Sequence, residues 1–168
     1  MLDKSKKSKI LCVDDDRTTL RLYRDFLSNP NYNVKTSTNA EDGFDLAKEF
    51  IPDLIISDVV MPGIDGLEFC RKVRNEPVLV SSIFLLASAK KVEVEDAINA
   101  LEGGADDYII KSFSKNELNA KINAFLRIKS LQDELKEANQ NLQKTLNELE
   151  EYKTILEKKN EELISKNQ

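Results

Sequence analysis

Polar side chains that can do chemistry follow four of the apolar runs in this sequence. They are Asp14, Asp15 and Asp16 after the first run, then Asp58, Ser88 and Lys111. Carboxylates brought together repel one another, and a small hard cation such as Mg²⁺ would hold them ionised because it prefers oxygen ligands. A carboxylate left partly open beside that cation can attack phosphorus as a nucleophile. A lysine and a hydroxyl could then stabilise the phosphoryl oxygens.

The sequence contains no histidine, and its formal net charge is −5. Without histidine, a Ser-His-Asp triad, a histidine nucleophile and a histidine-ligated zinc site are excluded. The acidic balance disfavours binding to nucleic acid, which usually requires a basic face.

No apolar run approaches the roughly 20 residues needed to cross a bilayer. Residues 1–9 are basic but polar, so we expect neither a signal peptide nor a membrane anchor. Cys12 and Cys70 both lie among apolar neighbours. We expect both to be reduced and buried, in a cytoplasmic protein.

The elements that must position the polar residues alternate along the chain. We expect strands at residues 9–13, 32–36, 53–57, 82–87 and 107–110. We expect helices at residues 18–27, 40–50, 67–74 and 92–101, and a last helix that begins after Ser114. This order predicts an α/β fold, a doubly wound five-stranded parallel sheet of the flavodoxin-like type. In such a sheet the functional crevice lies beyond the carboxyl ends of the strands, where the polar residues stand.

Several local signals should fix the helix ends. Asp16 and either Thr38 or Asn39 are expected N-caps, and Ser114 with Glu117 matches a capping box. Gly103 is expected to end the helix at 92–101 in the left-handed conformation. Asp106 and Asp107 are interpreted as acidic residues of a loop.

Four stretches together resemble the receiver (CheY-like) domain of two-component response regulators. They are "ILCVDDD" at 10–16, "DLIISDVVMPGIDG" at 53–66, "FLLASAK" at 84–90 and "GADDYIIKSF" at 104–113. Each motif alone is weak, but all four occur in order, each at a predicted strand end. The resemblance covers residues 8–128.

The resemblance implies a role for each matching residue. Asp58 is the phosphoacceptor, Asp15, Asp58 and the backbone carbonyl of Val60 bind Mg²⁺, and Asp14 acts through a bound water. Lys111 contacts the phosphoryl group, Ser88 is the switch hydroxyl, and Tyr108 is the aromatic residue that moves with it. Val60, Ala89 and Lys90 flank the pocket and would adjust the lifetime of the phosphoryl group.

One position departs from the pattern of the family. Receiver domains usually have a cis proline after the lysine, but here Ser112 follows Lys111. A cis bond to a residue other than proline costs about 2.5–4 kcal/mol. A trans bond would shift the loop, and this leaves the placement of the lysine open.

The C-terminal segment, residues 129–168, has the pattern of a coiled coil. Apolar residues recur every seven positions, at Ile128, Leu135, Leu142, Leu149, Leu156 and Leu163. The second seam position is either the series from Leu131 to Lys159 or the series from Phe125 to Asn160, and the first is the more apolar. A single helix from residue 114 would extend about 80 Å. We therefore expect a parallel homodimer through residues 128–163, with an antiparallel pair or a trimer as alternatives.

The leading hypothesis is a signalling domain that is not an enzyme beyond assisting its own phosphorylation and dephosphorylation. A histidine kinase or phosphotransfer protein would be the phosphodonor, and the coiled coil would transmit the switch. One alternative is a constitutive dimerisation or scaffold module whose pocket does not switch. A remote alternative is a phosphatase of the haloacid dehalogenase type, because Asp14 and Asp16 after a strand are similar to its nucleophile motif.

Overall fold

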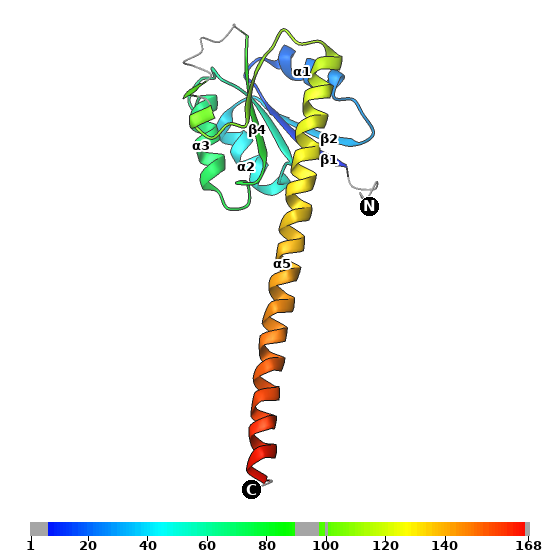
Figure 1. Cartoon of the computed structure of the whole chain (residues 1–168). Helices are drawn as coiled ribbons and strands as arrows, with labels where there is room; N and C mark the ends of the chain where they lie inside the picture. The colour runs from blue at the N-terminus through cyan, green and yellow to red at the C-terminus, as the bar shows by residue number, and fades with distance from the viewer. Residues whose placement is uncertain (1–6, 90–97, 100, 167–168) are drawn as a thin grey trace. The chain divides into compact units, whose positions relative to one another are not determined.

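The computed structural model of the chain describes residues 7–89, 98–99 and 101–166 (Figure 1). The chain divides into two compact units, Met1–Lys129 and Ser130–Gln168. The division falls beside the predicted boundary between residues 128 and 129. We describe each unit by itself.

The first unit is built on a five-stranded sheet in the order β2-β1-β3-β4-β5, with all neighbouring strands parallel. The strands are β1 (Ser8–Val13), β2 (Tyr32–Ser37), β3 (Leu54–Asp58), β4 (Ile83–Ser88) and β5 (Asp107–Ile110). Every predicted strand is present, and its ends differ from the prediction by no more than one residue. The predicted fold class is therefore confirmed.

The helices are α1 (Arg17–Phe26), α2 (Ala40–Phe50), α3 (Gly66–Asn75) and α5 (Lys115–Lys166). Asp16 caps α1, and Asn39 rather than Thr38 caps α2. The capping box is also confirmed, because the Glu117 carboxylate accepts from Ser114 N and the Ser114 hydroxyl accepts from Glu117 N.

The helix predicted at residues 92–101 lies largely outside the described residues. Residues 98–99 and 101–102 are helical. The helical residues end directly before Gly103, but the prediction that Gly103 is left-handed was wrong. Gly103 N still donates to Asn99 O as in a helix, and Gly104 takes the left-handed conformation with φ of 98°.

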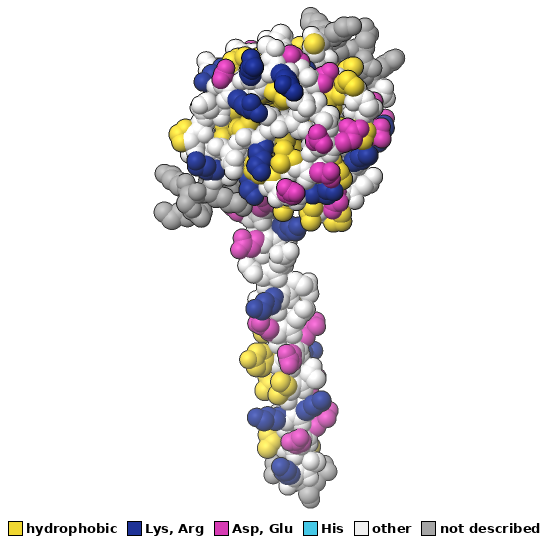
Figure 2. Space-filling model, turned by 180° about the vertical axis from the view of Figure 1, so that it is seen from behind, with side chains coloured by type: hydrophobic (Ala, Val, Ile, Leu, Met, Phe, Trp, Pro, Cys, Tyr) yellow, Lys and Arg dark blue, Asp and Glu magenta, His cyan; other side chains and the backbone are white. Residues whose placement is uncertain are grey.

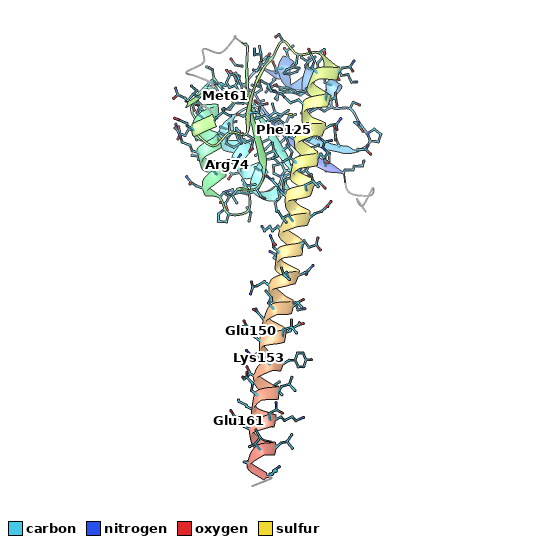
Figure 3. All side chains as sticks on the ribbon, viewed as in Figure 1. Met61, Arg74, Phe125, Glu150, Lys153 and Glu161 are labelled. Atoms are coloured by element: carbon cyan, nitrogen blue, oxygen red, sulfur yellow. The ribbon has the colours of Figure 1, made fainter. Side chains whose placement is uncertain are left out.

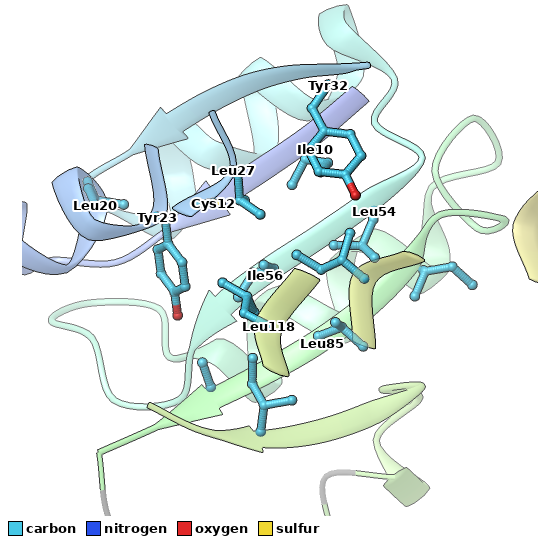
Figure 4. Packing of buried hydrophobic residues seen from close by; sticks show 14 residues of the cluster. Ile10, Cys12, Leu20, Tyr23, Leu27, Tyr32, Leu54, Ile56, Leu85 and Leu118 are labelled. Carbon is cyan, nitrogen blue, oxygen red and sulfur yellow. The ribbon is translucent and has the colours of Figure 1, made fainter. Parts of the chain in front are cut away.

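Two apolar clusters cover the two faces of the sheet. One joins Cys12 and Ile56 of the strands to Tyr23 of α1 and Leu118 of α5 (Figure 4). The other contains Leu11, Ile55 and Leu86 together with residues of α2 and α3. Successive strand residues thus point to opposite faces, as β-geometry requires.

Both cysteines are buried and free, as the sequence indicated. Burial raises the pKa of the Cys70 thiol to about 11, so the thiol stays neutral and packs as a small apolar group.

The second unit consists of the remainder of α5, whose leucines are exposed. Leu135, Leu142, Leu149 and Leu156 are each about 60% exposed, at 63%, 59%, 58% and 62%. Figure 2 shows apolar side chains interspersed with charged ones along this helix. Among the described residues, none of the helices contains an apolar stretch that could span a bilayer.

Arg74, labelled in Figure 3, joins α3 to two other segments of the first unit, around Ser82 and around Asp106. Its guanidinium donates to the carbonyl oxygens of Gly104, Val80 and Ser82 and to the Asp106 carboxylate. The same carboxylate oxygen of Asp106 accepts from Phe84 N at 2.7 Å. The planar, five-donor guanidinium suits this task better than an ammonium.

We therefore expect Arg74→Lys to lower the free energy of unfolding by about 2 kcal/mol, because the part-buried carbonyl groups of Gly104 and Ser82 lose their donors. Urea denaturation measures this loss. Arg71→Lys is the control, because Arg71 is an exposed residue of the same helix, three positions before Arg74. This change should lower the free energy of unfolding by less than about 0.5 kcal/mol. Equal stability of the two variants would contradict the role given to Arg74.

Candidate functional site

The carboxyl ends of β1 and β3 place two acidic side chains next to each other. Val13 pairs with Ser57 in the sheet, so Asp14 and Asp58 occupy the following positions on neighbouring strands. Carboxylate oxygens of Asp14, Asp15 and Asp58 all lie within 4.8 Å of one another. The predicted carboxylate cluster is therefore present at the edge of the sheet where it was expected.

Lys111 projects into this cluster from the end of β5. Its Nζ atom lies 2.6 Å from Asp14 Oδ2 and 2.9 Å from Asp58 Oδ1. Its backbone N donates to Ser88 O at 2.7 Å, which holds the residue against the end of β4. The described peptide bonds are all trans, including Lys111–Ser112. The lysine thus reaches the carboxylates without the cis bond that is usual in the family.

Asp58 is held in a fixed orientation by its own loop. Asp58 Oδ1 accepts from Val59 N at 2.9 Å, and the side chain is 12% exposed. The chain then returns, and Gly66 N donates to Val59 O. A Cβ at Gly66 would lie 2.1 Å from the Asp58 carbonyl oxygen, so only glycine allows this close approach.

Asp14 is fully buried, and Asp16 N donates to its Oδ1 at 3.0 Å. Burial raises the pKa of Asp14; the hydrogen bond and charge of Lys111 oppose this effect, and the charge of Asp58 adds to it. For Lys111, burial lowers the pKa, but the ion pairs with Asp14 and Asp58 outweigh it and raise the pKa above its usual value. The lysine therefore stays protonated at neutral pH.

The other sequence-predicted site residues surround the cluster. Asp15 is exposed, Ser88 is half-buried at the end of β4, and the Val60 side chain is 77% exposed. Tyr108 is half-buried and packs against the cluster on the α2 and α3 face. Lys90 lies outside the described residues. The metal, switch and lifetime roles of these residues stay predictions.

Sequence reasoning missed what Asp106 and Asp107 do. Asp106 lies in the loop before β5, as interpreted. The interpretation of Asp107 as a loop acid was wrong, because Asp107 begins β5 and forms an ion pair with Lys121, with Nζ 2.6 Å from Oδ2. Asp106 pairs with Arg74 and accepts from Phe84 N. Neither contact has a local sequence signal, because each partner is distant along the chain.

The donor set fits a hard divalent cation. Three carboxylates converge, one of them exposed, and the described residues offer only oxygen ligands there. This is the ligand type that Mg²⁺ prefers, whereas softer metals prefer nitrogen or sulfur.

The chain belongs to the response regulator receiver domain family, whose model matches residues 10–123. This match covers the sheet, α1 to α3, and the pocket at the strand ends. Response regulators of this family take part in two-component signalling. In the haloacid dehalogenase alternative, the pair Asp106 and Asp107 would correspond to a later acidic motif of that family. The alternative gains no support, because Asp106 forms an ion pair with Arg74 and Asp107 with Lys121.

Individual relatives agree with this assignment. The chain is similar to the response regulator ArlR of Staphylococcus aureus, with 41% identity over 120 residues, which are 71% of this chain and 53% of the relative. It is similar to the solved structure of a putative response regulator from Chloroflexus aurantiacus, with 31% identity, a TM-score of 0.68, and coverage of 73% of this chain and 99% of that one. The BeF3-activated receiver domain of DrrB is 30% identical with a TM-score of 0.64, over 72% of this chain and 98% of that one. The chain thus spans about half the length of the curated relatives it matches.

The buried Asp14 gives a prediction about pH. Because its folded pKa is raised, the stability of the folded state falls as pH rises from about 4, the usual pKa of aspartate, through the higher folded value. Asp14→Asn removes this loss. We expect the variant to be more stable than the natural sequence at pH 7 without divalent cations, and equally stable at pH 3.

Asp16→Asn is the matched control, measured by urea unfolding between pH 3 and 8 in EDTA. Hydrogen bonds from Thr18 and Thr19 lower the pKa of Asp16. The Asp16 carboxylate therefore stabilises the folded state above about pH 4, and this contribution to stability is lost as pH falls. A difference between Asp14→Asn and the natural sequence that is independent of pH would contradict the argument.

Proposed function

We propose that this chain accepts a phosphoryl group on Asp58, with Mg²⁺, and transmits the change through the helix α5. The phosphodonor is a histidine kinase or a phosphotransfer protein, since the chain contains no histidine. The observation that carries the proposal is the position of Lys111 Nζ, within 2.9 Å of both Asp14 and the candidate phosphoacceptor Asp58.

The contacts of Asp58 indicate which of its two carboxylate oxygens attacks phosphorus. Its Oδ1 atom is engaged by Val59 N and Lys111, which assigns the attack on phosphorus to Oδ2. The new O–P bond forms as the P–N bond to the donor imidazole breaks, and the imidazole nitrogen takes a proton from solvent. The product is an aspartyl phosphate.

Asp15, Asp58 and the Val60 carbonyl would hold Mg²⁺, with Asp14 acting through a bound water. When bound, the cation offsets the charge of the carboxylates and of the phosphoryl oxygens. Lys111 moves from the carboxylates onto a phosphoryl oxygen, and the Ser88 hydroxyl donates to another. Tyr108 then moves inward behind Ser88, which alters the surface around β5 and α5.

The domain acts as a signalling switch that assists only its own phosphorylation and dephosphorylation. The buried, free cysteines suit a reducing compartment, so we propose that the protein works in the cytoplasm.

We propose that α5 forms a parallel homodimer through residues 128–163. The support is the run of exposed leucines at seven-residue spacing, which a lone helix leaves in water. The seam that adds Leu131 and Tyr152 is preferred, because both are apolar and exposed, at 59% and 66%. A second copy supplies the same stripe and so the matching surface.

The phosphoacceptor is tested with a small acyl phosphate and Mg²⁺. The natural sequence should gain one acid-labile phosphoryl group, seen by mass spectrometry, and Asp58→Asn should gain none. Asp65→Asn is the control, because Asp65 lies in the same loop, caps α3, and asparagine caps equally well. Labelling that survives Asp58→Asn would overturn the proposal.

The dimer is tested by analytical ultracentrifugation of Leu149→Asp beside Ile155→Asp. Both residues are exposed and apolar, at 58% and 49%, but only Leu149 belongs to the heptad. We expect Leu149→Asp to weaken association by at least about 100-fold and Ile155→Asp by less than about tenfold. Equal effects would contradict the heptad seam.

The constitutive dimerisation alternative differs in its response to beryllofluoride, which mimics an aspartyl phosphate. The switching domain should change the scattering profile or the cross-linking pattern of the dimer when the mimic binds. An unchanged dimer with the mimic bound would favour the constitutive module.

A further inference from the structure

Two buried side-chain oxygens have no hydrogen-bond partner among the described residues: Asp14 Oδ2 and the Tyr23 hydroxyl. Asp14 Oδ2 lies 2.6 Å from Lys111 Nζ, so its charge is balanced by an ion pair. The Tyr23 hydroxyl has no such compensation, although the residue is fully buried. A buried hydroxyl without a partner costs about 1–3 kcal/mol, and phenylalanine would avoid that cost.

Tyr23 packs on the face of the sheet that carries the pocket side chains. It belongs to the apolar cluster that contains Cys12, Ile56 and Ile109. These residues come two positions before Asp14, Asp58 and Lys111 respectively, and residues two apart on a strand point to the same face. The cluster therefore lies on the same face of the sheet as the pocket side chains, one layer nearer the amino ends of the strands.

Two further observations place the ring at the carboxyl ends of the strands. Tyr23 stacks on Phe113, with ring centroids 6.0 Å apart, and Phe113 lies two residues after Lys111. In Figure 4, Tyr23 lies at the end of the sheet opposite Ile10 and Leu54, and its hydroxyl points away from Leu20. Burial raises the pKa of Tyr23, and the charges of Asp14 and Asp58 add to the effect, so the hydroxyl keeps its proton and remains a donor.

Phosphorylation would change which partner Asp14 has. In the structure, Lys111 is shared between Asp14 and Asp58. Once Lys111 moves onto a phosphoryl oxygen, Asp14 Oδ2 would lose the ammonium and remain buried. A buried carboxylate without a donor is costly, whereas a hydroxyl held nearby removes much of that cost.

We propose that Tyr23 is a positioning residue for the phosphoacceptor pocket: its hydroxyl donates, directly or through one buried water, to the Asp14 carboxylate when Lys111 moves to the phosphoryl group. This inference rests on the proposed function. It explains why the chain keeps a tyrosine where phenylalanine would fill the same space without an unpartnered oxygen.

The first experiment compares Tyr23→Phe with Tyr32→Phe in the full chain. Tyr32 is the matched control, because its hydroxyl donates to Asn123 Oδ1 at 2.5 Å and it lies at the amino end of β2. Beryllofluoride with Mg²⁺ is the probe, titrated by calorimetry. We expect Tyr23→Phe to weaken binding about tenfold, the loss for one hydrogen bond to a charged group. Tyr32→Phe should leave it unchanged.

The second experiment separates positioning from packing. In Lys111→Met the Asp14 carboxylate already lacks its ammonium, so the Tyr23 hydroxyl should stabilise the resting fold. Tyr23→Phe should then lower the urea midpoint of unfolding in the Lys111→Met background. In the natural background the same substitution should raise the midpoint or leave it unchanged. Additive effects in this double-mutant cycle would overturn the inference.

The outcomes distinguish this inference from the function on which it rests. If the natural sequence does not bind beryllofluoride, the proposed phosphoacceptor fails, and the double-mutant cycle still decides whether Tyr23 and Asp14 are coupled. If the natural sequence and Tyr23→Phe bind the probe equally, only the role of Tyr23 fails.

Discussion

The structure of the pocket depends on one ammonium group held between two carboxylates. Asp14 is fully buried and Asp58 nearly so, and two such charges on adjacent strands would repel each other without compensation. Lys111 contacts both, and their negative charge keeps the lysine protonated although it is largely buried. Because Lys111 comes from β5 and the carboxylates from β1 and β3, the interaction exists only when the sheet is assembled. The same arrangement leaves the pocket ready to change when new negative charge arrives, since the ammonium can transfer its contacts to that charge.

The rest of the first unit holds these three side chains in place. The apolar clusters on both faces fix the strands, and the close approach of Gly66 to the Asp58 carbonyl fixes the loop after β3. Arg74 ties the start of β4 to the segment before β5, at the opposite ends of the strands from the pocket. The trans bond at Ser112 is compatible with the lysine contact, because Lys111 N is already anchored on Ser88 O.

Most of the fold and the main pocket residues could be predicted because their signals are local. A strand that ends in aspartate, or a serine three residues before a glutamate, identifies an element end without knowledge of any distant partner. The roles of Arg74, Asp106 and Tyr23 could not be predicted in this way. Arg74 and Asp106 are 32 residues apart, and Tyr23 meets Phe113 across 90 residues of chain, so only the folded structure joins them.

Gly103 and Gly104 have the same local signal, and the extent of the preceding helix decided which one became left-handed. The coiled-coil register could not be predicted from local sequence either, because the two candidate seams share the same leucines.

The central claim is that these carboxylates form a site for one divalent cation beside a lysine. Its most direct test is a calorimetric titration of the unmodified chain with Mg²⁺, repeated for Asp15→Asn. The claim predicts one ion bound per chain, with a midpoint in the millimolar range or tighter, and binding at least about tenfold weaker in the variant. Equal binding by both chains, or no saturable binding by either, would contradict it.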